Sequence, residues 1–208
     1  MLTRLLKLFD KTTHCFVFLT AGCLPAEALL ALRILGLFGM ICRLPDNILH
    51  KMAEQALLTE DDRSGSWFVQ ARLLCRKYQL HTAIKLLSLN LLKERLKSLA
   101  KSKVVDHWEN QLRQEVSEKS SLCFFNPYSS SLSNPHPILI SPGSNPYEVN
   151  KPLVQLRMLS GRYRDDMLMR HWTPDNHQGT CGLCLSTEGD LEHYFNLPCT
   201  ASAETEFV

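Results

Sequence analysis

Apolar residues recur every three or four positions between residues 25 and 120, which is the period of an amphipathic α-helix. The clearest repeats are Trp67, Ala71, Leu74 and Tyr78; Leu89, Leu92, Leu96 and Leu99; and Val105, Trp108, Leu112 and Val116. The pattern predicts a mostly α fold, with an irregular array of helices across residues 1 to 118.

Two earlier helix starts can be placed from residue types that favour the first turn. Pro25 and Glu27 suit the start of a helix that carries the apolar run up to Cys42. Asp46 is the expected cap of the next helix, because its short carboxylate can accept a hydrogen bond from a free backbone N–H. One face of that helix would carry Ile48, Met52 and Ala56.

The composition changes between residues 119 and 150, where proline and serine become frequent. Proline is excluded from helix interiors and from central strands, so we expect a linker or an irregular strap there. Asn150 can cap a further helix whose second residue is Pro152 and which runs to about Trp172. The third segment, residues 151 to 208, would contain this helix and a small carboxy-terminal module.

The cysteines and the amino-terminal apolar run bear on the compartment. Five of the eight cysteines are scattered through apolar helical patterns, which favours an intracellular protein, in the cytoplasm or the nucleus, over a secreted disulfide framework. The run from 15 to 24 resembles the apolar part of a signal peptide, but Asp10 and His14 stand before it. A membrane span needs about 20 unbroken apolar residues, and Pro25, Glu27 and Arg33 interrupt this one. We expect buried core helices and no membrane partner.

Two acidic patterns could indicate catalysis. Residues 163 to 166 read Tyr-Arg-Asp-Asp, a form that reverse transcriptases use to bind metal at the turn of a β-hairpin. Here the flanking period is helical, so Asp165 and Asp166 are expected to pair with neighbouring arginines on a solvated face. Asp175 and Glu188 loosely resemble a restriction-like nuclease, but the lysine that such a site needs after Glu188 is missing. Neither pattern predicts an enzyme.

A cluster near the carboxy terminus has the spacing of a zinc knuckle with widened loops. Its sequence is Cys-x2-Cys-x8-His-x5-Cys, and the expected ligands are Cys181, Cys184, His193 and Cys199. A structural zinc site contributes about 10 to 16 kcal/mol in finger peptides, which is enough to help order so short a segment. Four protein ligands leave no open position, so Zn²⁺ would be structural. Unliganded thiols on a frayed tail are the alternative.

Four blocks resemble the region that follows the polymerase domain in LINE-type non-LTR retrotransposon proteins of animals. In order they are LGLFGMICRLPDNILHKMA, NPYEVNKPLVQLRMLSGRYR, RHWTPDN and GDLEHYFNLPC, and the likeness extends from about residue 5 to residue 199. The resemblance implies a non-catalytic reverse transcriptase fragment whose Cys-His cluster binds nucleic acid. The family's last ligand usually follows the histidine after four residues, whereas five separate His193 from Cys199.

The net charge of +2 is too small to indicate nucleic acid by itself, so local clusters must carry that argument. One cluster lies in the run from 91 to 103 and offers Lys97, Lys101 and Lys103 for phosphate contacts. The second adjoins the Cys-His cluster and comprises Arg157, Arg162, Arg164, Arg170 and His171, with Trp172 and Tyr194 available to stack on bases. Solvated faces of amphipathic helices are the alternative for both.

The expected function is therefore binding of RNA or single-stranded DNA, with the upstream polymerase domains of the parent protein as further partners and no small-molecule substrate. A helical protein-interaction module with a purely structural zinc site is the first alternative. A restriction-like nuclease remnant built on Asp175 and Glu188 is the second.

Overall fold

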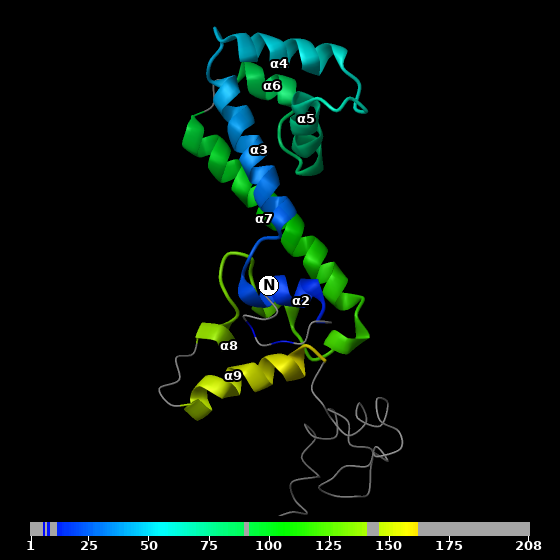
Figure 1. Ribbon diagram of the computed structural model, residues 1–208, viewed down its shortest axis with the longest axis vertical. Coiled ribbons are helices and arrows are strands. Elements are labelled where there is room, and N and C mark those ends of the chain that lie inside the picture. Colours follow the sequence, from blue (N-terminus) through cyan, green and yellow to red (C-terminus); the bar gives the residue numbers. More distant parts are fainter. Residues whose placement is uncertain (1–5, 7, 9–11, 90–91, 141–145, 162–208) are drawn as a thin grey trace, which may run out of the picture. The chain divides into compact units, whose positions relative to one another are not determined.

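The computed structural model describes residues 6, 8, 12–89, 92–140 and 146–161, with the backbone alone for 146–150 (Figure 1). Within these ranges the chain is predominantly helical, which confirms the mostly α fold class. The α-helices are α2 (His14–Ala21), α3 (Ala26–Cys42), α4 (Ile48–Thr59), α5 (Trp67–Lys77), α6 (Ala83–Ser88), α7 (Lys93–Ser117), α8 (Pro137–Ile140) and α9 (Pro146–Leu159). Two 3-10 turns, η1 (Ser120–Leu122) and η2 (Pro127–Ser129), lie between α7 and α8.

The chain divides into two compact units. The helical unit comprises His14–Glu118 and Pro127–Pro137, and therefore holds α2 to α7 and η2. The second unit takes the remaining segments, including Lys119–Asn126 and α9.

Helix α7 provides the longest packing surface of the helical unit. Its buried residues recur at steps of four, namely Leu96, Ala100, Val104, Trp108, Leu112 and Val116. Because an α-helix has 3.6 residues per turn, each step of four rotates the stripe by about 40°, or about 200° over the whole series. The stripe therefore winds around α7, which packs against α3 along its first half and against α2 further on (Figure 1). The expected apolar repeat is confirmed, except that Val104 and not Val105 lies in the buried stripe.

The repeat of Leu89, Leu92, Leu96 and Leu99 does not form one helix. Helix α6 ends at Ser88 and α7 begins at Lys93. Leu89 and Leu92 adopt extended backbone conformations at the two ends of the break, with ψ of 107° and 138°. The leucine period thus spans a bend, and Leu92 is exposed.

Helix α4 begins one residue later than a cap at Asp46 would require. The cap is Asn47, whose Oδ1 accepts a hydrogen bond of 2.9 Å from the backbone N–H of Leu49. A cap side chain accepts a hydrogen bond from the backbone N–H two or three residues further along the chain. Leu49 is two residues after Asn47, so its N–H is in the position that this cap requires. The predicted apolar face is also displaced, because Ile48 is 72% exposed and the buried residues are Ala53, Ala56 and Leu57.

Three helices of the helical unit are tied together near the start of α3. Lys77 at the end of α5 forms an ion pair of 2.7 Å with Glu27 in the first turn of α3. The same ammonium lies 5.3 Å from the ring centroid of Trp108 in α7, and the Trp108 indole N–H donates to the Tyr78 hydroxyl at 3.3 Å. The Glu27 carboxylate raises the pKa of Lys77. These contacts fix the start of α3 against α5 and α7.

Residues 127 to 137 lie against α2 and α7 within the helical unit. Glu109 of α7 accepts hydrogen bonds from the Ser131 hydroxyl at 2.9 Å and from the Leu132 N–H at 2.8 Å. The His136 N–H donates to the Thr20 carbonyl at 2.9 Å. Leu132 and His136 are buried. We name this segment the strap.

Helix α9 begins and ends earlier than the sequence predicts. It starts at Pro146, so Asn150 lies inside the helix and does not cap it, and it ends at Leu159 well before Trp172. Gly161 follows with a φ of 62°, a left-handed conformation that commonly ends helices. A side chain at Gly161 would collide with the Ser121 carbonyl of the same unit, so the end of the helix requires glycine.

No single helix among the described residues is long and apolar enough to cross a membrane. Helices α2 and α3 together reach that length and apolarity, but they are bent by 61° at the break between them.

The position of the α4 cap can be tested with a matched pair of substitutions. Asn47→Ala removes the side-chain acceptor of the Leu49 N–H, so the free energy of unfolding should fall by about 1 kcal/mol. Asp46→Ala, one residue away, should change it by less than about 0.5 kcal/mol. Urea denaturation followed by circular dichroism measures both, and the reverse order of the two effects would contradict the observed cap.

Candidate docking groove

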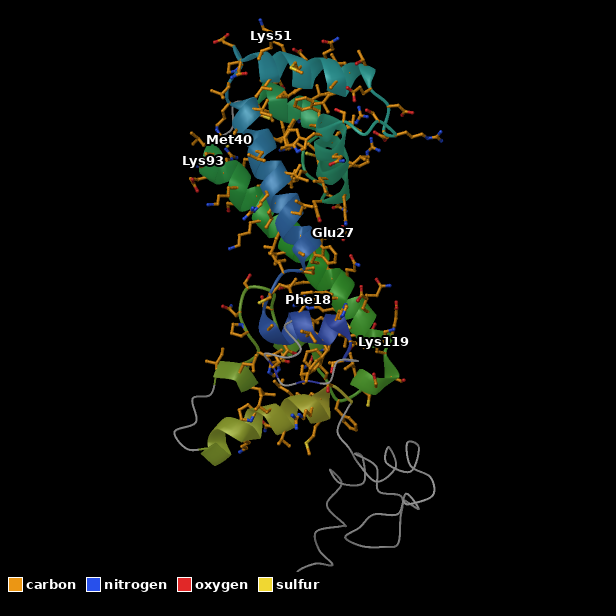
Figure 2. The ribbon with its side chains drawn as sticks, in the orientation of Figure 1. Phe18, Glu27, Met40, Lys51, Lys93 and Lys119 are labelled. Carbon is orange, nitrogen blue, oxygen red and sulfur yellow. The ribbon has the colours of Figure 1, made fainter. Side chains whose placement is uncertain are left out.

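An open groove of about 680 Å³ runs between α3 and the first half of α7 in the helical unit. Its floor is apolar and is formed by Leu29, Leu32, Leu35, Gly36, Leu37, Met40, Leu96 and Ala100. Its rims carry five cations, which are Arg33, Arg43, Lys93, Lys97 and Lys101. Figure 2 shows the end of α3, marked by Met40, beside the start of α7, marked by Lys93.

The apolar floor exists because α3 carries more apolar residues than one buried face can hold. Ala28, Ala31 and Phe38 are among the residues on its covered side. On the groove side, Leu29 and Met40 are each 52% exposed and Leu37 is 53% exposed. A helix that is apolar all round is normally buried on every side, so this side of α3 has the character of a surface that another element covers.

Two glycines one turn apart set the depth of the groove. A side chain at Gly39 would collide with the Leu96 side chain, so the bare backbone there permits the close approach of α7. At Gly36 a side chain would meet nothing within 4 Å. The helices are therefore in contact at Gly39 and leave open space at Gly36.

The cations on the rims come from both helices. Lys93, Lys97 and Lys101 are four residues apart on α7 and so lie on one face of it. Arg33 and Arg43 add two charges from the α3 side. Like charges four residues apart cost a helix about 0.2 to 0.5 kcal/mol per pair, so this arrangement does not stabilise α7.

None of these five side chains forms an ion pair among the described residues. The cations that do are Arg72, Arg76, Lys77 and Arg113. No aspartate or glutamate lines the groove within the described part of the chain. The rims therefore carry an uncompensated positive charge beside an apolar floor.

The structure brings together only part of the site predicted from the sequence. Lys97 and Lys101 line the groove, whereas Lys103 is half-buried and does not. Arg157 lies in the last turn of α9, in the second unit. The other predicted nucleic-acid contacts lie outside the described residues: Arg162, Arg164, Arg170, His171, Trp172 and Tyr194.

The expected metal and catalytic residues also fall outside the described ranges. This holds for Cys181, Cys184, His193 and Cys199, and for the acidic residues Asp165, Asp166, Asp175 and Glu188. Among the described residues no group of histidine, cysteine, aspartate and glutamate side chains is arranged to hold a metal ion. The zinc site stays a prediction.

Arg33, Arg43 and the apolar floor were not predicted from the sequence. The available signal was the excess of leucine and methionine on all sides of α3, together with two arginines in an otherwise apolar stretch. The two rims of the groove come from residues 50 or more positions apart in the sequence. Only the packing of α3 beside the lysine face of α7 brings them together.

The helical unit also contains potentially reactive side chains outside the groove, namely the thiols of Cys42 and Cys75 and the imidazole of His136. Their surroundings give them structural roles. Burial raises the pKa of the Cys42 thiol to about 11 and that of the Cys75 thiol to about 12, so both stay protonated and unreactive at neutral pH. His136 Nε2 lies 3.0 Å from the Ser129 hydroxyl in the strap, and burial lowers the pKa of this histidine. This contact links two residues of the strap to one another.

Comparison of the chain with protein-family models, with characterised proteins and with solved structures gives no match. The groove must therefore be interpreted from its own geometry and charge.

The different surroundings of the two glycines can be tested by substitution. Gly36→Ala should raise the free energy of unfolding by about 0.5 to 1 kcal/mol, because alanine favours the helix and its Cβ meets open space. Gly39→Leu should lower it by about 1 to 3 kcal/mol, because the added side chain overpacks the crossing with Leu96. Urea denaturation followed by circular dichroism measures both changes. A destabilised Gly36→Ala variant would show that the groove is closed in solution.

Proposed function

We propose that the helical unit is an interaction module that binds a helical segment of another protein in the groove between α3 and α7. The observation that carries this proposal is the half-exposed apolar floor formed by Leu29, Leu37 and Met40. Grooves of this kind bind amphipathic helices through apolar residues spaced three and four apart.

The dimensions of the groove support a helix as the ligand. Its α3 side extends from Leu29 to Arg43, which corresponds to about 21 Å at 1.5 Å per residue. A helix of about 14 residues has the same length. Pockets for small molecules enclose about 70 to 90% of the ligand surface, whereas this groove is open along its side and would leave a small ligand largely exposed to water.

Binding of RNA or single-stranded DNA is the second candidate function. It is favoured by the lysine face of α7, where Lys97 and Lys101 have no ion-pair partner among the described residues and could contact phosphates. Proteins that bind single strands usually add aromatic side chains on which bases stack. The described groove lining has none, so this candidate ranks below protein binding. The origin from a retrotransposon protein is a proposal that rests on the sequence blocks alone.

The proposed function can be tested with a neutral amphipathic peptide of about 14 residues, with leucine on one face and glutamine and alanine elsewhere. We expect the full chain to bind it, as measured by fluorescence anisotropy, and Gly36→Trp to weaken binding by at least about tenfold because the indole fills the groove. Gly65→Trp is the matched control, since a side chain at Gly65 also meets nothing within 4 Å but lies outside the groove.

A fluorescein-labelled single-stranded RNA separates the two candidates in the same assay. Protein docking predicts RNA binding that is weaker than peptide binding. RNA binding that is tighter than peptide binding, unaffected by Gly36→Trp and reduced by Lys97→Glu would contradict docking. It would support the nucleic-acid candidate, for which each phosphate contact contributes about 0.7 to the salt slope.

The zinc knuckle is proposed separately, from its ligand spacing. Native mass spectrometry of the purified chain should show one zinc ion per molecule, and the double substitution Cys181→Ser with Cys184→Ser should abolish it. Cys23→Ser is the control, because Cys23 is an exposed cysteine of the helical unit and should leave the zinc in place. Zinc retained by the double variant, or absent from the unmodified chain, would contradict the site.

A further inference from the structure

We infer that the partner of the groove is an acidic amphipathic helix, whose apolar face covers the leucine floor and whose carboxylates lie against the lysine and arginine rims. This inference rests on the proposed function and names the chemical class of the partner. It follows from the combination of an open apolar floor with charges of one sign on both sides.

The rims select for negative charge. Lys97 occupies the middle of the α7 rim, with Lys93 and Lys101 one turn away on either side. Arg33 and Arg43 stand on the α3 side. Since no carboxylate of the described chain lines the groove, a partner must supply the opposite charge.

The spacing of the charges matches a helical partner. Successive lysines on α7 are four residues apart, or about 6 Å along the helix axis. A second helix that lies along the groove presents its own side chains at the same interval. Glutamates four residues apart on this helix can therefore face Lys93, Lys97 and Lys101 in succession, while its leucines enter the floor near Gly36.

Other occupants fit the groove less well. A second copy of this chain would bring the same cations to the same place, and like charges across an interface disfavour association. A membrane surface is broad and cannot follow the floor between two helices, where Leu35 is buried. A basic or neutral helix would leave the rim charges unpaired.

The inference can be tested with three peptides that share one leucine face and differ only at the polar positions, which are all glutamate, all glutamine or all lysine. Anisotropy titrations with the full chain should show the glutamate peptide binding at least about tenfold more tightly than the glutamine peptide. The lysine peptide should bind most weakly. Raising the salt from about 50 to 200 mM should reduce the difference, because exposed charges are screened.

A charge exchange identifies the residues responsible. The double substitution Lys97→Glu with Lys101→Glu should weaken binding of the glutamate peptide by at least about tenfold and strengthen binding of the lysine peptide. Lys103→Glu is the matched control on the same helix, because Lys103 does not line the groove, and it should change binding by less than about threefold. Circular dichroism of each variant checks that the helices are retained.

The outcomes distinguish this inference from the proposed function. Equal affinity for the glutamate and glutamine peptides, both abolished by Gly36→Trp, would overturn the inference and keep the docking function. Absence of binding by all three peptides would overturn both. The chain could instead bind single-stranded RNA or phosphatidylserine vesicles more tightly than the glutamate peptide. If Lys97→Glu with Lys101→Glu abolished that binding, the result would overturn the inference and assign the rims to that ligand.

Discussion

The winding apolar stripe of α7 is the constraint on which the helical unit depends. Its buried residues from Leu96 to Val116 recur every four positions, so the covered side of the helix turns steadily along its length. The elements that pack on α7 therefore approach it from different directions along its length. Helix α3 covers the amino-terminal part, and α2 and the strap cover the part that follows. Helix α3 has 17 residues and α7 has 25, so α3 cannot cover α7 completely, and the groove lies beside their contact.

The groove combines features that do not favour stability of the isolated unit. The half-exposed leucines on α3 gain only part of the stabilisation that full burial would give, and glycine at 36 weakens a helix interior. Three lysines on consecutive turns of α7 repel one another. Natural proteins retain such arrangements at binding surfaces, where a ligand supplies the missing contacts. The coincidence of all three at one place is a stronger indication of binding than any one of them.

The sequence predicted the helical class and the apolar stripe of α7, because both follow from a period that local physics enforces. It misplaced the α4 cap by one residue, since Asp46 and Asn47 are both good caps and only the observed bond to Leu49 separates them. It continued a leucine period through the bend between α6 and α7, because periodicity does not register a change of chain direction. The groove was missed for a different reason: Arg33 and Lys101 come together only through tertiary packing.

The strap makes the helical unit discontinuous in sequence. The chain leaves this unit after Glu118, returns at Pro127 and leaves again after Pro137. Glu109, which is mostly buried, takes two hydrogen bonds from the returning segment. A shortened chain that stopped at the end of α7 would remove these two donors and leave the carboxylate with Arg113 of α7 as its partner. Any attempt to isolate the helical part of the molecule should therefore retain the chain as far as residue 137.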